Sequence, residues 1–285
     1  MTLADYQNYF QEALKESYPN SEIERFFYWL VEASFGYSRF QTSLHKQRVL
    51  LAQEKDQFDA SLQRLLNYEP IQYIIGSTEF FGLQFVVTPA TLIPRPETEE
   101  LVQWILEDVN SLEQETSRIL DIGTGSGCIA ISLAKELKNT QVSAVDISEE
   151  ALAVAAKNAI TNNSPVHFEH LDILKTKSLE DRYHVIVSNP PYVRMLEKEL
   201  MQPNVLDHEP ETALFVSNED PLLFYRKIAN LGRTALHPNG SIYFEINEYL
   251  SKELVDLLKG LRYTKIEVRK DIFGKDRMMK CTYHD

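Results

Sequence analysis

The sequence has little cysteine and no long apolar run. Its 285 residues include only Cys128 and Cys281, which have no paired spacing. This argues against a disulfide framework or a cysteine-rich zinc site and is typical of a reducing cytoplasm. No run of about 18 apolar residues occurs, which excludes a membrane-spanning helix of ordinary length. The first residues show no signal-peptide pattern. We therefore expect a cytoplasmic protein with no membrane partner.

Positive charge is also scarce. Lys and Arg total 29 against 42 Asp and Glu, which gives a formal net charge of −13. Proteins that grip nucleic-acid backbones usually carry a basic face. We therefore expect no direct nucleic-acid partner, and a basic protein partner fits better. The seven histidines show no ligand spacing. We interpret His167 and His170 as surface residues and expect no metal site.

The first part of the chain has helical spacing. Apolar residues recur at the interval of a helix at Leu3, Tyr6, Phe10 and Leu14. Ser21 and Glu24 predict a capping box at the start of a second helix, and Gly36 predicts its end. Further helical patterns cover residues 38–53 and 56–67.

The pattern then changes to β. Residues 78–88 predict a hairpin around Gly82, and Pro89, Pro94 and Pro96 follow it. We therefore predict three parts. These are a helical substrate-docking domain over residues 1–76, a hairpin and linker over 77–98, and a second domain over 99–285.

Strands and helices alternate in the second domain. Strand patterns cover residues 118–122, 142–145, 166–170, 185–188, 241–246, 265–269 and 278–283. Helical patterns cover residues 129–137, 149–162, 221–236 and 250–258; we interpret the lysines from Lys252 to Lys259 as a solvated helix face. This alternation predicts an α/β, Rossmann-like fold with a mostly parallel seven-stranded sheet. The short turn before the last strand predicts one antiparallel edge strand.

A glycine-rich segment follows the first of these strands. It reads Asp121-Ile122-Gly123-Thr124-Gly125-Ser126-Gly127. Glycine lets the backbone turn sharply and approach a ligand closely. The dinucleotide pattern G-x-G-x-x-G would need its third glycine at Cys128, whereas the spacing here is G-x-G-x-G. This departure favours S-adenosylmethionine over a nicotinamide cofactor. We predict cofactor contacts from Gly123, Thr124, Gly125, Ser126 and Gly127.

Two acidic residues end the next two strands. Asp146 lies 19 residues after Gly127, where a carboxylate can accept both ribose hydroxyls. Asp172 can accept from the adenine amino group, and Ile173 can pack on the ring. A helix N-cap is the alternative role for Asp172. Ligands bind at the carboxyl ends of strands in open α/β sheets, so we predict that all three residues contact the cofactor.

The segment Asn189-Pro190-Pro191-Tyr192 directly follows the strand 185–188. A planar amide or amine nitrogen has a delocalised lone pair and must be held to attack a methyl group. The Asn189 side-chain oxygen and the Pro190 carbonyl can each accept one N–H. The prolines fix the backbone, and Tyr192 offers a flat face. We predict catalytic roles for Asn189, Pro190 and Tyr192, substrate contacts from the whole segment, and a cofactor contact from Asn189. These residues alone leave adenine and glutamine open as targets.

The chain resembles the protein-(glutamine-N5) methyltransferases that modify peptide chain release factors, the HemK/PrmC family. The resemblance covers nearly the whole sequence. It is most specific in residues 69–76 with 79–82, in residues 91–99, in the glycine loop with Asp146, and in Asn189–Tyr192. His208-Glu209-Pro210, Ala213-Leu214, Asp271 and Arg277 also match. Two departures concern loops: Asn247 replaces a usual glycine, and Glu219-Asp220-Pro221 replaces a more common Asp-Gly.

The resemblance implies a class I S-adenosylmethionine-dependent methyltransferase domain. It implies a helical N-terminal domain that docks the release factor, and methylation of the glutamine in that factor's Gly-Gly-Gln motif. Arg95 would orient the cofactor or act as a structural donor. We expect a monomer. The alternatives are a methyltransferase acting on adenine N6 or guanine in nucleic acid, an adapter that binds the cofactor without catalysis, and a nicotinamide dehydrogenase. The net charge argues against a nucleic-acid methyltransferase. Asn189 argues against an adapter without catalysis, and the glycine spacing argues against a dehydrogenase.

Overall fold

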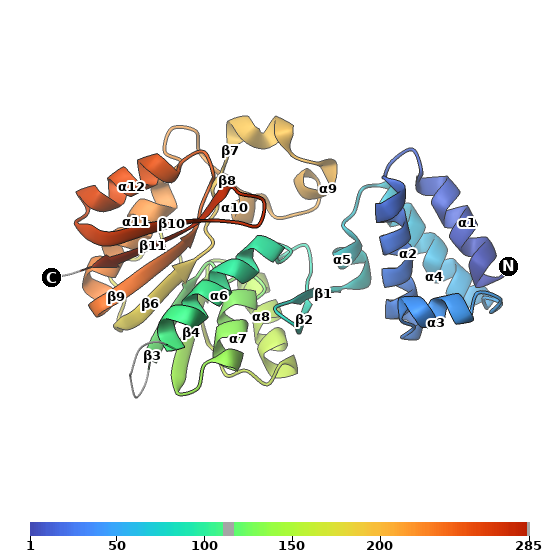
Figure 1. The fold of residues 1–285 in the computed structure, drawn as a ribbon, viewed down its shortest axis with the longest axis horizontal. Coiled ribbons are helices and arrows are strands. Elements are labelled where there is room, and N and C mark those ends of the chain that lie inside the picture. The colour runs from blue at the N-terminus through green and yellow to red at the C-terminus, as the bar shows by residue number, and fades with distance from the viewer. Residues whose placement is uncertain (111–116, 284–285) are drawn as a thin grey trace. The chain divides into compact units, whose positions relative to one another are not determined.

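The computed structural model describes residues 1–110 and 117–283 (Figure 1). The chain forms two compact units. The first contains Met1–Gly76 and Gln202–His208, and the second contains Ser77–Met201 and Glu209–Asp285. Within the described ranges, no helix is both long enough and apolar enough to cross a membrane.

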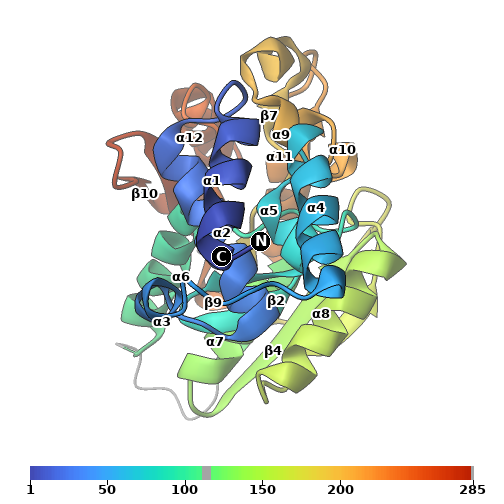
Figure 2. The ribbon, with the colours of Figure 1, turned by 90° about the vertical axis from the view of Figure 1, so that its right-hand side faces the viewer.

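The first unit is helical, and Figure 2 faces it. Its helices before residue 77 are α1 (Leu3–Leu14), α2 (Asn20–Phe35), α3 (Arg39–Leu44), α4 (Ala52–Leu66) and α5 (Ile71–Ile75). The four residues predicted as the apolar stripe of the first helix are all buried. Tyr6 of α1 and Phe58 of α4 meet edge to face, with ring centroids 5.4 Å apart. Aromatic packing of this kind joins the helices into one core.

The predicted start of the second helix was wrong. Helix α2 begins at Asn20 after Pro19, and no side-chain capping bond forms there. Pro19 is the N-cap residue, and Ser21 lies inside the first turn of the helix, where its side chain cannot act as the cap. The predicted end at Gly36 is confirmed, because this residue has φ 69° and its N–H donates to the Glu32 carbonyl.

The helix expected over residues 38–53 was also wrong in extent. Helix α3 ends at Leu44, and α4 begins only at Ala52. The intervening backbone serves the start of α1: the Lys46 and Arg48 carbonyls accept from Ala4 and Leu3 at 3.0 and 2.8 Å. A tertiary contact has therefore overridden the local helical pattern.

A later segment completes the first unit. Residues Gln202–His208, which contain the short helix α9 (Pro203–Leu206), belong to it. The His208 ring nitrogen Nε2 lies 2.9 Å from the Asn67 carbonyl oxygen. The helical unit is thus built from two separate stretches of the chain.

The second unit opens with the predicted hairpin, formed by β1 (Ser77–Phe80) and β2 (Leu83–Val86). The Asn158 side chain, which is fully buried, accepts from Val86 N at 2.7 Å and donates to the Val86 and Ser126 carbonyls. One amide therefore ties the hairpin to the glycine loop. Helix α6 (Pro96–Asn110) follows, and it was not predicted because its proline-rich start suggested a linker. Proline is in fact well suited to the first helical position.

The main sheet has seven strands in the order β10-β11-β9-β6-β3-β4-β5. Their bounds are β3 (Ser117–Ile122), β4 (Thr140–Asp146), β5 (His167–His170), β6 (Tyr183–Ser188), β9 (Leu236–Glu245), β10 (Tyr263–Lys270) and β11 (Asp276–Tyr283). Strands β9, β6, β3, β4 and β5 pair in parallel, and β11 pairs antiparallel with β9 and β10. The predicted mostly parallel sheet is confirmed. The predicted position of the antiparallel strand was wrong, because β11 inserts between β9 and β10 and leaves β10 at the edge.

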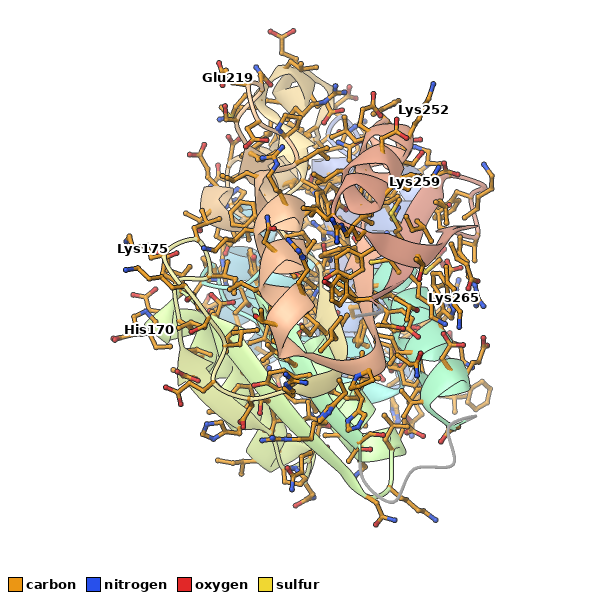
Figure 3. The ribbon with its side chains drawn as sticks, turned by 90° about the vertical axis from the view of Figure 1, so that its left-hand side faces the viewer. His170, Lys175, Glu219, Lys252, Lys259 and Lys265 are labelled. Atoms are coloured by element: carbon orange, nitrogen blue, oxygen red, sulfur yellow. The ribbon has the colours of Figure 1, made fainter. Side chains whose placement is uncertain are left out.

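Helices cover both faces of this sheet (Figure 1). Helices α6, α7 (Cys128–Glu136) and α8 (Glu149–Thr161) contribute to one buried cluster, and α11 (Leu223–Ala235) and α12 (Ser251–Gly260) contribute to the other. Both cysteines are buried and free. Lys252 and Lys259 on α12 are exposed (Figure 3), as the interpretation of a solvated face requires.

Short elements fill the chain between Tyr192 and α11. They are β7 (Val193–Arg194), the 3-10 helix η1 (Met195–Leu200), α9, α10 (Glu211–Leu214) and β8 (Phe215–Val216). Strands β7 and β8 form a separate parallel pair. None of these was predicted, because elements this short carry no periodicity.

Candidate active site

The sheet register brings four chain positions to one edge. Ile122, Val145, Ser188 and Phe244 stand side by side across β3, β4, β6 and β9. The residues that follow them are Gly123, Asp146, Asn189 and Glu245. Three of these four were predicted as site residues, so the predicted cofactor and substrate residues converge at one place. Glu245 was not predicted.

The glycine loop runs from β3 into α7 in left-handed backbone conformations. Gly123, Gly125 and Gly127 have φ values of 74°, 56° and 82°, which only glycine adopts without strain. At Gly123 and Gly125 a β-carbon would meet no heavy atom within 4 Å, so the backbone there faces open space. At Gly127 a β-carbon would lie 2.8 Å from Ile131 Cδ1. The first two glycines leave room for a ligand, and the third permits close packing of α7.

Asp146 holds the glycine loop. Its carboxylate accepts from Gly125 N at 2.8 Å and from Ser148 N at 2.9 Å. The backbone N–H groups of Gly123 and Thr124 also donate to the Val145 carbonyl. Asp146 is only partly buried, and a carboxylate has about four acceptor positions. It therefore retains capacity for the predicted contact with ribose hydroxyls.

Asp172 follows β5 and is engaged locally. Its Oδ1 accepts from Leu174 N at 3.0 Å, and its Oδ2 lies 2.9 Å from Lys175 Nζ. The hydrogen bond from Lys175 lowers the Asp172 pKa. The backbone after Asp172 forms only a turn, so the helix N-cap named as its alternative role does not form. Leu171 N donates to the Asp146 carbonyl, which brings Asp172 and the buried Ile173 next to the Asp146 strand end.

The last residue of β5 lies at the surface. His170 is exposed and lies 3.6 Å from Glu149. Figure 3 shows His170 and Lys175 extending from the same side of the structure. Among the described residues, no group of three or more His, Cys, Asp or Glu could hold a metal ion.

The side chains of Asn189 and Tyr192 have different hydrogen-bond partners. Asn189 is partly exposed, and its Nδ2 lies 3.5 Å from Thr98 Oγ1. Tyr192 is also partly exposed as a residue, but its hydroxyl donates to Glu245 Oε1 at 2.9 Å. Burial of the phenol and the adjacent Glu245 charge raise the Tyr192 pKa well above its usual value. Pro190 is buried and Pro191 is partly exposed.

Glu245 and Thr98 are site residues that the motifs did not predict. Glu245 is 2% exposed, and its Oε2 accepts from the Thr98 hydroxyl at 2.6 Å. Burial raises the Glu245 pKa, and the hydrogen bonds from Thr98 and Tyr192 partly offset that rise. Both residues stand in segments that the sequence singled out, Thr98 within residues 91–99 and Glu245 beside the departure at Asn247. Their side-chain roles depend on long-range contacts and left no local signal.

Asn247, which stands where the family usually has glycine, makes two hydrogen bonds with its side chain. Its Nδ2 donates to the Tyr192 carbonyl at 3.0 Å and to Glu197 Oε2 at 2.9 Å. A glycine could make neither bond. In this chain the end of β9 therefore fixes the backbone after Asn189 as well as the Tyr192 hydroxyl.

Two buried carboxylates pair with the arginines that the sequence singled out. Arg95 Nη2 lies 2.5 Å from Glu209 Oε1, whose side chain is fully buried. Glu209 also accepts from Ile93 N at 3.2 Å. Arg277 Nε lies 3.0 Å from Asp271 Oδ2. These pairs give Arg95 the structural role named as one of its two alternatives.

Comparison with known proteins identifies the family. Residues 5–76 match the family described as the PrmC N-terminal domain, and residues 103–208 match the Methyltransferase small domain. A release factor glutamine methyltransferase of Flavobacterium psychrophilum is 48% identical over 99% of this chain and 100% of its own. This chain belongs to the release factor glutamine methyltransferases. The resemblance inferred from the sequence is therefore confirmed.

Other relatives agree. The release factor glutamine methyltransferase of Bacteroides thetaiotaomicron is 44% identical over 95% of this chain and 96% of its own. A crystal structure of a methyltransferase from Pyrococcus furiosus is 18% identical, with a TM-score of 0.52, over 82% of this chain and 100% of that one. At this identity the structural likeness shows the fold alone, and it confirms the class I methyltransferase architecture.

The cofactor of this family fits the site. S-adenosylmethionine is the methyl donor that the methyltransferase domain implies, so the predicted cofactor class is confirmed. Gly123 and Gly125 leave open space beside the loop. Asp146 lies at the loop, and Asp172 and Ile173 follow the next strand. Together they offer backbone room, acceptors and an apolar contact along one edge of the sheet.

Proposed function

We propose that this protein transfers a methyl group from S-adenosylmethionine to the side-chain amide nitrogen of the glutamine in the Gly-Gly-Gln motif of a peptide chain release factor. The observation that carries the proposal is a partly exposed Asn189, in register with the glycine loop, in a chain whose relatives are release factor glutamine methyltransferases.

The mechanism is mainly one of holding the amide. When bound, S-adenosylmethionine would supply an electrophilic methyl group: as the amide nitrogen bonds to the methyl carbon, the carbon–sulfur bond breaks and leaves a neutral thioether, and the nitrogen gives up one proton. Asn189 Oδ1 accepts one N–H of the glutamine amide, and the Pro190 carbonyl accepts the other. Both contacts withdraw hydrogen toward acceptors and make the nitrogen more nucleophilic. Positioning of this kind can provide most of a rate enhancement.

Tyr192 supports the planar amide. Its hydroxyl is anchored on Glu245 and its backbone carbonyl on Asn247. The hydroxyl and the backbone of Tyr192 are each held by one hydrogen bond, while part of the residue stays exposed. We propose that this exposed part, with Pro191, forms the wall against which the glutamine amide lies.

The helical unit provides a second surface for the same partner. We propose that residues 1–76 dock the body of the release factor, and that the net charge of −13 favours a basic partner. We further propose that the protein acts as a monomer in the cytoplasm, where release factors are used, and without direct contact to nucleic acid.

The test is methyl transfer from labelled S-adenosylmethionine to a purified release factor. Label should enter the wild-type factor but not a variant whose Gly-Gly-Gln glutamine is replaced by glutamate. Duplex DNA and ribosomal RNA serve as competing substrates in parallel reactions. Label in nucleic acid and none in the factor would overturn the proposal.

A further inference from the structure

A chain of hydrogen bonds connects Asn189 to a buried carboxylate. Glu245 Oε2 accepts from Thr98 Oγ1 at 2.6 Å, and Glu245 Oε1 accepts from the Tyr192 hydroxyl at 2.9 Å. Thr98 Oγ1 in turn lies 3.5 Å from Asn189 Nδ2. Thr98 and Glu245 are both 2% exposed, so bulk water does not compete for these contacts.

The order of donors and acceptors along this chain is fixed by chemistry. The Thr98 and Tyr192 hydroxyls each donate to Glu245, one to each carboxyl oxygen. A hydroxyl has a single hydrogen. Once Thr98 has donated to Glu245, its oxygen can only accept. Of the two ends of the Asn189 amide, only the NH₂ group can therefore face Thr98.

This order decides which atom of Asn189 faces the substrate. The oxygen and nitrogen ends of an asparagine amide have nearly the same shape, and only their hydrogen bonds distinguish them. With Nδ2 held toward Thr98, Oδ1 is left as the end available to accept an N–H. A reversed amide would present a donor to the donor groups of a glutamine amide and would repel it.

The same end of β9 restrains the backbone beside Asn189. Asn247 Nδ2 donates to the Tyr192 carbonyl at 3.0 Å. Elsewhere on the same residue, the Tyr225 hydroxyl donates to the Glu245 main-chain carbonyl at 3.0 Å. The Tyr225 bond uses the backbone of Glu245 and has no part in the order of hydroxyl donors. It therefore offers a matched control.

We infer that Thr98 and Glu245 are positioning residues for methyl transfer, which orient the Asn189 amide so that its oxygen faces the glutamine N–H. The inference rests on the proposed function. It assigns to the carboxylate an indirect role, because Glu245 acts through Thr98 and Tyr192 and not on the substrate.

The first variant is Glu245→Gln, which keeps the shape but adds an NH₂ donor. One of the two hydroxyls must then accept instead of donate, and the order along the chain is broken. We expect kcat to fall by about 10- to 100-fold, as small errors in position can cause. KM for the release factor and Kd for S-adenosylmethionine should change by less than about threefold. Thermal stability should stay unchanged or rise, because a buried charge is removed.

The second pair of variants is Thr98→Val and Thr98→Ser. Valine has no hydroxyl and should lower kcat as Glu245→Gln does, whereas serine restores the hydroxyl and should recover most of the activity. Tyr225→Phe is the control. It removes a buried hydrogen bond to the same glutamate and should lower the melting temperature while kcat stays near the wild-type value.

A readout independent of catalysis is the Asn189 side-chain NH₂ signal in the NMR spectrum, assigned from its loss in Asn189→Asp. It should shift in Thr98→Val and in Glu245→Gln but not in Tyr225→Phe. A wild-type kcat in Glu245→Gln, or an unmoved Asn189 signal in Thr98→Val, would overturn the inference. If the wild-type enzyme methylates no release factor, the proposed function fails, and the NMR comparison still tests the orientation of Asn189.

Discussion

The glycine loop and the Asn189–Tyr192 segment lie at the same edge of one sheet, yet they are held in different ways. The loop is held by a hydrogen bond to the end of β4, in which Gly125 N donates to Asp146, 21 residues away. The Asn189 segment depends on Thr98 and Glu245, through bonds that span 91 and 53 residues. The predicted cofactor region is therefore held by nearby segments, and the predicted substrate region requires the completed fold.

This difference has a consequence for the effects of mutation. Changes in the glycine loop act on a compact βα turn and should alter local packing and cofactor affinity. Changes around Asn189 act on a network of polar groups and should alter turnover with little effect on cofactor affinity. Four variants separate the two kinds of behaviour.

The largest expected effect is on turnover at Asn189. Asn189→Ala removes the side-chain acceptor for the glutamine N–H, and we expect methyl transfer to fall by about 10³-fold, the size of effect seen for a lost preorganised polar contact. Calorimetry should show nearly unchanged binding of S-adenosylmethionine. The control is Asn230→Ala on the exposed face of α11, which should behave as wild type. Transfer by Asn189→Ala at the wild-type rate would contradict the mechanism.

A substitution in the glycine loop should lower the free energy of unfolding. At Gly127 a β-carbon would stand 2.8 Å from Ile131 Cδ1, and φ is +82°. Gly127→Ala should therefore cost roughly 2 to 4 kcal/mol in the free energy of unfolding, from strain and overpacking together. Urea denaturation measures it. Gly260→Ala is the control, because a β-carbon there meets nothing within 4 Å. Equal stability of the two variants would show that the loop tolerates a side chain at this position.

Buried charge beneath the loop predicts a pH dependence. Burial raises the pKa of Asp121 from 3.8 to about 7, and its hydrogen bond from Thr124 only partly offsets this. The folded state then binds the proton more tightly than the unfolded state. The resulting stabilisation is complete below pH 3.8 and is lost as pH rises through about 7.

Asp121→Asn should remove that dependence. Unfolding free energies of the wild type and the variant, measured by urea titration at several values from about pH 3.5 to pH 8, should differ least at the acidic end, below pH 3.8. The wild type should lose stability toward pH 8 and the variant should not. Parallel curves would show that Asp121 does not titrate in this range.

The smallest effect is expected at Asp146. Asp146→Asn leaves one acceptor oxygen where the carboxylate has two, and it weakens the hold on Gly125. We expect the Kd for S-adenosylmethionine to rise by about tenfold, which corresponds to the loss of one ordinary hydrogen bond to a charged group, with kcat nearly unchanged. Asp181→Asn is the control, since Asp181 pairs with Arg118 on the exposed surface. An unchanged Kd in Asp146→Asn would remove Asp146 from the cofactor site.

The sequence predicted the parts of the site that depend on local pattern. The glycine spacing, the strand that ends at Ser188 and the acidic residue that ends β4 each combine a residue type with a strand end, and the sheet register brings them together. Thr98 could not be predicted as a partner of Glu245, because no rule of spacing connects residues on α6 and β9 that are 147 apart.

The errors in the fold have the same origin. Residues 45–51 follow a helical pattern but instead serve the start of α1 through backbone hydrogen bonds. The last strand follows β10 directly in sequence but inserts between β10 and β9. In both places a distant backbone partner decided the structure, and a pattern read along the chain contains no information about that partner.

The return of the chain to the helical unit at Gln202–His208 affects how such a protein can be recombined. The His208 ring contacts the carbonyl of Asn67. If residues 1–76 were exchanged for those of a relative, the relative's residue at position 67 would face the original His208 segment. A single crossover in the gene therefore cannot transfer the helical unit intact. The two stretches must be exchanged together if the unit is to keep the contact between them.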